Sequence, residues 1–168
     1  GGVALELAPD VTLDMSGAVA LRCALSPSDP ALRGHKVLGE VILPGVGFIE
    51  LARQALAGVG GGSFELSRVV LLEPLVVRDR VVATVVLSGD SGRGSFEVRT
   101  GDGTAPLVHA QGQFERRDVS GAHHPVLDVD QVKRRCGARV DTEELYGRFA
   151  QVGIEYEHDY RGIVELWS

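Results

Sequence analysis

The sequence has few of the features that mark secreted, membrane or nucleic-acid-binding proteins. Its 168 residues include 2 cysteines, Cys23 and Cys136, and without a secretion signal we expect reduced thiols. No apolar run approaches the ~20 residues that span a bilayer, and Gly1-Gly2-Val3-Ala4 lacks the basic start and apolar core of a signal peptide. Lysine is scarce, no basic stripe is present and the net charge is −6, which argues against nucleic acid as a partner. We therefore expect a cytoplasmic protein with no membrane or nucleic-acid partner.

The length and the hydrophobic fraction of 44% allow one domain, or one domain and part of another. Residues 18–25 alternate apolar and smaller or polar side chains with the period of a strand, and a Pro-rich segment at 26–30 ends that strand. Pro44 is suited to the first position of a helix, because its missing N–H would have no partner there. Apolar residues cover most of the following helix, which is therefore expected to be buried and to end at Gly58 and the glycines after it.

Strand-like segments follow the helix, at 64–72, 81–87, 95–99 and 106–114. Residues 89–94 are rich in glycine and predict a hairpin loop. In the last segment, His109 alternates with apolar neighbours and is expected to be exposed on a polar face. A buried helix followed by consecutive antiparallel strands predicts an α+β fold, a sheet curled around the helix.

The composition changes after residue 116. Residues 117–140 have the composition of a linker, and acidic residues at 141–144 begin a short helix that Gly153 ends. A last strand-like run, at 160–167, has no later segment with which to pair.

The residues best suited to catalysis lie between positions 35 and 50. His35 can take a proton near neutral pH, and the helix that starts at Pro44-Gly45 offers unpaired backbone N–H groups that polarise a carbonyl. Proton abstraction beside a thioester carbonyl requires these two parts. Only glycine at position 45 would let a thioester approach the backbone so closely.

The spacing His35-x3-Gly39-x4-Pro44, with Pro44-Gly45 opening a helix, resembles the N-terminal signature of dehydratase domains from modular polyketide synthases. Residues 153–162 resemble a second motif of that family, Gly-x-x-Tyr-Gly-Pro-x-Phe-Arg. Here Glu157 and His158 stand in place of Gly-Pro, and Tyr160 stands in place of Phe.

The resemblance implies a double hotdog, two halves that each wrap a sheet around a long helix. It divides the chain into a first hotdog at 1–116, a linker at 117–140 and the start of a second hotdog at 141–168. Such domains remove water from a 3-hydroxyacyl group on an acyl carrier protein. The histidine comes from the first half and a catalytic aspartate from the helix of the second half, which we expect beyond Ser168 or on another chain.

The resemblance also gives the candidate site residues. His35 is the expected general base, and Tyr156 the expected hydrogen-bond donor to substrate or acid. Gly39, Pro44 and Gly45 are the expected substrate-binding positions, with the Gly45 N–H stabilising the enolate. We expect no cofactor and no metal. The expected partners are an acyl carrier protein, other synthase domains, the second hotdog half and a second copy in a homodimer.

Three other functions stay open. Glu157 and His158 suggest a double-bond isomerase or a ring-forming cyclase on the same scaffold. Single-hotdog dehydratases carry a catalytic glutamate on this helix, so a homodimer could use Glu50 as its acid. A non-catalytic scaffold domain of a synthase is the remaining alternative.

Weaker patterns have simpler explanations. Gly89-Asp-Ser91-Gly matches the nucleophile segment of trypsin-like proteases, but no matching His and Asp precede it in strands. A cluster of metal-capable side chains in the linker has no recognised ligand spacing, and we expect it to be solvated; its members are His123, His124, Asp128, Asp130 and Cys136.

Overall fold

The computed structural model describes residues 10–13, 19–60, 62–101, 105–117 and 126–168, with only the backbone described for 10–13 and 158. Its main element is an antiparallel six-stranded sheet in the order β1-β2-β6-β7-β8-β5. The strands are β1 (Asp10–Leu13), β2 (Val19–Leu25), β5 (Ser63–Leu71), β6 (Val81–Gly89), β7 (Arg93–Thr100) and β8 (Leu107–Arg117).

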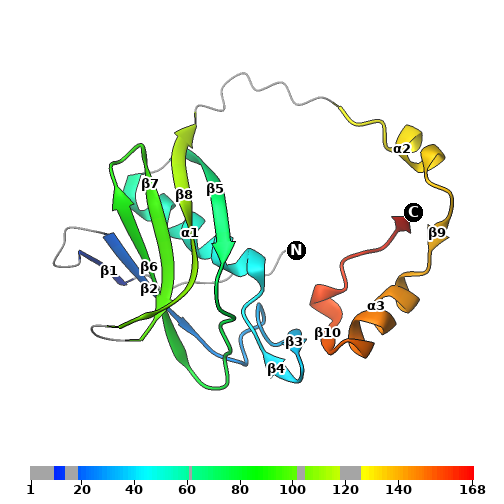
Figure 1. Ribbon diagram of the computed structural model, residues 1–168, viewed down its shortest axis with the longest axis horizontal. Helices are drawn as coiled ribbons and strands as arrows, with labels where there is room; N and C mark the ends of the chain where they lie inside the picture. Colours follow the sequence, from blue (N-terminus) through cyan, green and yellow to red (C-terminus); the bar gives the residue numbers. More distant parts are fainter. Residues whose placement is uncertain (1–9, 14–18, 61, 102–104, 118–125) are drawn as a thin grey trace.

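Helix α1 (Gly45–Gly60) lies against one face of this sheet, which curves around it in Figure 1. Leu51 and Ala52 are fully buried, and they share one core with Val85 and Val98 of the central strands. Leu51, Val85 and Val98 each contribute roughly 1.5–3 kcal/mol by leaving water, and the smaller Ala52 contributes less. The predicted antiparallel sheet around a buried helix is therefore confirmed.

The helix boundaries differ slightly from the prediction. Helix α1 begins at Gly45, directly after Pro44, and runs through Gly58 to Gly60. Gly58 lies inside the helix and its φ is not positive, so it does not end α1. The predicted hairpin at 89–94 is confirmed, with Asp90 Oδ1 accepting from the N–H groups of Gly92 and Arg93. No helix among the described residues is both long and apolar enough to cross a bilayer.

A second, three-stranded sheet contains β3 (His35–Val37), β4 (Glu40–Val41) and β10 (Ile154–Tyr156), in the order β10-β3-β4. A two-residue turn joins β3 to β4, with φ of 53° at Leu38 and 80° at Gly39. Two positive φ values are typical of the type I′ turn that matches strand twist. Gly39 is therefore explained by the turn that directs the chain from His35 towards the helix.

Two glycines allow a matched test of this turn. A Cβ at Gly39 or at Gly58 would meet no atom within 4 Å, so only backbone conformation distinguishes the two positions. We expect Gly39→Ala to destabilise the fold by about 1–2 kcal/mol, because an L-residue resists positive φ. We expect Gly58→Ala, in a helix, to stabilise it by up to about 1 kcal/mol. Urea unfolding of both variants measures the difference; the same sign for both would contradict this description of the turn.

The C-terminal region has more structure than the composition indicated. The predicted linker contains helix α2 (Val129–Arg135), capped by Asp128, and strand β9 (Arg139–Val140). Helix α3 (Thr142–Gln151) begins after its cap Asp141 and ends before Gly153, as predicted, and β10 follows it. The run at 160–167 is mostly irregular, and only β11 (Leu166–Trp167) is a strand; its partner is β9, which precedes it in the chain. The division at 116 and 140 stays a prediction.

Candidate active site

His35 lies at the start of β3 and is held at both its backbone and its ring. Its N–H donates to the carbonyl of Leu32 at 2.9 Å, and its carbonyl accepts from the N–H of Ile42 at 3.3 Å. The ring atom Nδ1 lies 2.9 Å from the carbonyl oxygen of Ile42. A carbonyl oxygen can only accept, so Nδ1 must carry the proton. In the neutral ring Nε2 is then the basic nitrogen, and no described residue hydrogen-bonds to it.

The two sequence motifs meet at this histidine. Strand β10 pairs with β3 so that Tyr156 stands directly opposite His35. Their ring centroids are 5.6 Å apart, and the ring of Tyr160 lies 5.5 Å from the imidazole. Pairing across β3 therefore brings together His35 and Tyr156, the two residues predicted to be catalytic.

Tyr156 is fixed by its ring and not by its hydroxyl. The ring packs edge-on against Phe149 at 5.4 Å and against Tyr146 at 6.1 Å, both on α3. Among the described residues none forms a hydrogen bond with the Tyr156 hydroxyl, and the side chain is half-buried. The hydroxyl is thus available to a substrate or to a group from another segment.

The helix start is tied to the segment that holds the histidine. Ile42 accepts the bond from the His35 ring, and Leu43 and Pro44, which follow it, are buried. Leu43 N donates to the carbonyl of Leu75 at 3.0 Å, which anchors this segment to the main core. Gly45 is the first residue of α1, where backbone N–H groups have no acceptor within the helix. The base and the helix N-terminus therefore belong to one connected unit.

Two glycines at the helix start have steric reasons to be glycine. A Cβ on Gly45 would lie 3.0 Å from Cδ1 of Leu71, and one on Gly47 would lie 2.6 Å from Cδ1 of Leu43. Sequence reasoning missed Gly47, since helical periodicity does not show which side chain crosses the first turn. Both glycines therefore allow Leu43 and Leu71 to pack closely against the first turn of α1.

Glu50 is engaged as a carboxylate. Its two oxygens accept from Arg53 at 2.7 Å each, and Gln54 donates to it at 2.7 Å. The hydrogen bonds from Arg53 hold the pKa of Glu50 below its usual value. A carboxylate held ionised is poorly suited to donate a proton, which disfavours Glu50 as a catalytic acid.

His109 is buried, and the expectation that it is exposed was wrong. The register of β8 shifts between its pairs with Val98 and Arg99, which inserts one extra residue at His109. Such a bulge turns a side chain to the other face of the sheet. His109 is 3% exposed, and its Nδ1 and Nε2 lie 3.1 Å from the carbonyl of Glu73 and 2.8 Å from the Thr100 hydroxyl. Both nitrogens are paired, which makes it a core histidine.

The described residues contain no group of three or more His, Cys, Asp or Glu that could hold a metal ion. His123 and His124 lie outside the described residues. Asp128 is used as the cap of α2, where it accepts from the N–H of Gln131 at 2.9 Å. Cys23 and Cys136 are free thiols, and burial raises the pKa of Cys23 to about 11.

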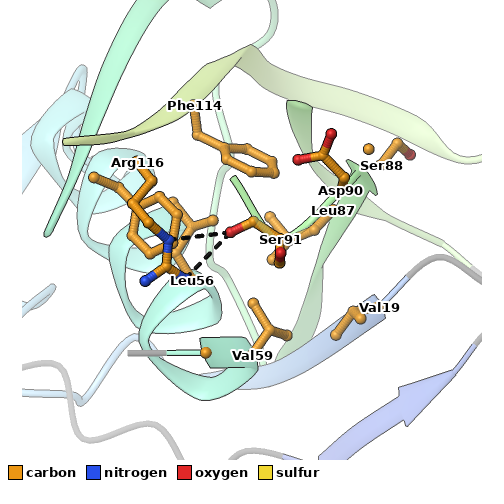
Figure 2. A pocket seen from close by; sticks show the side chains of 12 residues that line it. Val19, Leu56, Val59, Leu87, Ser88, Asp90, Ser91, Phe114 and Arg116 are labelled. Atoms are coloured by element: carbon orange, nitrogen blue, oxygen red, sulfur yellow. Dashed lines mark hydrogen bonds between the residues drawn. The ribbon is translucent and has the colours of Figure 1, made fainter. Parts of the chain in front are cut away.

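A pocket of about 380 Å³ lies at the C-terminal end of α1, shown in Figure 2. Leu56, Phe64 and Phe114 give it apolar walls. The guanidinium of Arg116 lies over the ring of Phe64 and donates to the carbonyl of Ser91 at 3.2 and 3.3 Å. His35 is joined to the opposite end of α1, so this pocket is separate from the candidate site.

Comparison with known proteins agrees with this architecture. The family model "Polyketide synthase dehydratase domain" matches residues 7–101. Mycoketide-CoA synthase of Mycobacterium tuberculosis is 34% identical over 164 residues, which cover 94% of this chain and 4% of that protein. The chain therefore spans a small part of this curated relative.

Solved dehydratase domains share the fold. The domain from the CurF module of curacin polyketide synthase matches with a TM-score of 0.85 at 22% identity, over 100% of this chain and 63% of that one. A trans-AT polyketide synthase dehydratase domain from Brevibacillus brevis matches with a TM-score of 0.85 at 24% identity, over 94% of this chain and 58% of that one. The fold is thus that of the N-terminal, hotdog part of these domains, and the chain belongs to the family of polyketide synthase dehydratase domains.

Proposed function

We propose that the chain supplies the basic half of a site that dehydrates a 3-hydroxyacyl thioester carried on an acyl carrier protein. The observation that carries this proposal is the bond from His35 Nδ1 to the Ile42 carbonyl, which leaves Nε2 as the basic nitrogen and ties the ring to the segment that leads into α1. Two solved variants of the CurK dehydratase support it: one has a histidine changed to phenylalanine, the other an aspartate changed to asparagine, and both are described as inactive.

The reaction needs a base, an enolate stabiliser and an acid. Nε2 of His35 takes a proton from the carbon next to the thioester carbonyl. The Gly45 N–H at the start of α1 stabilises the negative charge that develops on the carbonyl oxygen. The electrons of the broken C–H bond form the C2–C3 double bond as the 3-hydroxyl leaves. An acid protonates that hydroxyl, so the products are a 2-enoyl thioester and water.

The acid in this proposal comes from a second hotdog half, covalent or on another chain. Strand β5 ends the order of the six-stranded sheet, so in the described structure one of its edges has no neighbouring strand. Apolar side chains are exposed beside it, with Val46 at 71%, Ile49 at 42% and Leu71 at 54%. An exposed apolar surface beside a sheet edge favours contact with another folded unit. This surface lies next to Gly45, where an added acid would reach the same substrate.

The pairing of Glu157 favours plain dehydration over an isomerase or cyclase. Its Oε1 accepts from Lys36 Nζ at 2.8 Å, and hydrogen bonding to Glu157 raises the pKa of that lysine. A carboxylate held by a lysine is a weaker candidate for a second proton-transfer step.

Product analysis tests the proposal. The natural polypeptide that carries this sequence would be incubated with a 3-hydroxyacyl thioester on an acyl carrier protein, and the acyl group analysed by mass and NMR. We expect the 2-enoyl thioester, 18 mass units lighter by loss of one water. A 3-enoyl or a cyclic product would instead establish the isomerase or cyclase, and unchanged substrate would support a scaffold domain.

A further inference from the structure

The turn after Tyr156 is fastened to the segment that leads into His35. The short helix η1 (His158–Tyr160) forms this turn, where Tyr160 N donates to the Glu157 carbonyl at 2.8 Å. Glu157 N donates to the carbonyl of Gly34 at 2.9 Å. The hydroxyl of Tyr160 donates to the carbonyl of Ala31. The turn is thus joined to the loop before His35 by one backbone bond, one side-chain hydrogen bond and an exposed ion pair between Arg33 and Asp159 at 3.9 Å.

The ring of Tyr160 reaches the catalytic candidate directly. Its centroid lies 5.5 Å from that of His35 and 6.3 Å from that of Tyr156, so the three rings contact one another. A Cβ on Gly34 would lie 2.9 Å from Cδ2 of Tyr160. Only glycine before His35 therefore leaves room for this ring.

Tyr160 acts in this arrangement as a fixed donor. Burial raises the pKa of its hydroxyl, which keeps the group protonated across the neutral range. A carbonyl oxygen cannot donate in return, so the bond to Ala31 has one polarity. The hydroxyl donates its proton to the Ala31 carbonyl, which makes it unsuited to be the missing acid.

The chain departs from the family pattern at three places in this turn, and the departures fit together. Pro in the pattern restricts φ and stiffens the turn, whereas Glu157 and His158 place no such restriction on φ. The phenylalanine of the pattern has no hydroxyl, whereas Tyr160 uses one to hold the loop. A side-chain bond here supplies the restraint that the backbone of Gly-Pro would supply.

We propose that Tyr160 is a positioning residue for His35, and that its bond to the Ala31 carbonyl replaces the rigidity of a Gly-Pro turn. The proposal rests on the proposed dehydratase function of His35. It follows that loss of the Tyr160 hydroxyl lowers kcat in this chain, and that the loss has little effect once Gly-Pro replaces Glu157 and His158.

The test uses the natural polypeptide and kcat and KM for dehydration. We expect Tyr160→Phe to lower kcat by about tenfold, the scale of a modest misplacement of a reacting group, with KM changed less than about twofold. The matched control is Tyr146→Phe, which also removes a tyrosine hydroxyl. That hydroxyl accepts from Ile163 N at 3.0 Å, and the Tyr146 ring contacts Tyr156 but not His35. We expect it to keep kcat within about twofold of the unchanged protein.

Rescue separates positioning from simple loss of stability. In the Tyr160→Phe background, Glu157→Gly with His158→Pro is expected to restore kcat to within about threefold of the unchanged protein. Gly34→Ala, which keeps the hydroxyl and displaces the ring, gives an independent loss of kcat. Unchanged kcat in Tyr160→Phe, an equal loss in Tyr146→Phe, or no recovery with Gly-Pro would each overturn the proposal. A His35→Gln variant in the same assay would show separately whether the proposed function itself fails.

Discussion

Replacing His35 with glutamine is expected to lower kcat for water loss by about 10²- to 10⁴-fold, the usual contribution of a general base. Glutamine is an informative replacement, because it is polar and close to histidine in length but has no basic nitrogen. The variant therefore removes the basic nitrogen while keeping a polar side chain at this position. The measurement is the steady-state rate of 2-enoyl thioester formation by the natural polypeptide.

A control on the same small sheet makes this result specific. Arg78→Gln breaks an exposed ion pair with Glu40 of β4, 3.0 Å long, and such pairs contribute little to stability. We expect Arg78→Gln to keep nearly full activity and both variants to unfold at similar temperatures. A His35→Gln variant that retains more than about a third of the activity would contradict the assignment of His35 as the base.

Truncating Leu51 to alanine is expected to lower the free energy of unfolding by about 2–5 kcal/mol. Leu51 is 0% exposed and lies in the middle of α1, within the core that joins the helix to the sheet. The surrounding side chains come from several strands and cannot all move into the space left behind. Denaturant unfolding followed by circular dichroism measures the loss.

The matched control is Val59→Ala, near the end of the same helix and 39% exposed. Little apolar area is lost there and alanine favours a helix, so we expect a change within about 0.5 kcal/mol. If Leu51→Ala cost less than about 1 kcal/mol, the buried helix would not be the centre of the fold.

The fold could be predicted where residues follow a simple period. Strand β6 is a run of β-branched residues in the centre of the sheet, and α1 has the all-round apolar character of a buried helix. The fixed spacing of His35, Gly39 and Pro44 reflects a two-residue turn and a short extended segment, whose geometry allows few other lengths.

The parts that sequence reasoning missed depend on irregularities and on distant pairing. One bulged residue in β8 reverses the face of His109, and alternation alone cannot reveal a bulge. The contact of Tyr160 with Ala31 and His35 joins segments far apart in the chain, so no local period contains it. The glycine at position 34, directly before His35, is the one local sign of this contact. Its meaning becomes clear only in the structure, where a Cβ at that position would meet the ring of Tyr160.

The most direct measurement of the central claim is transfer of a proton to and from C2 of the substrate. A base that removes the α-proton in dehydration must return one to C2 in the reverse reaction. With a 2-enoyl thioester in D₂O, the natural polypeptide is expected to form a 3-hydroxyacyl thioester with one deuterium at C2, detected by mass and NMR. With His35→Gln, that product is expected to form at least 10²-fold more slowly. Equal rates of C2 deuteration in the two proteins would contradict the account, because the proton would then be carried by a group other than His35.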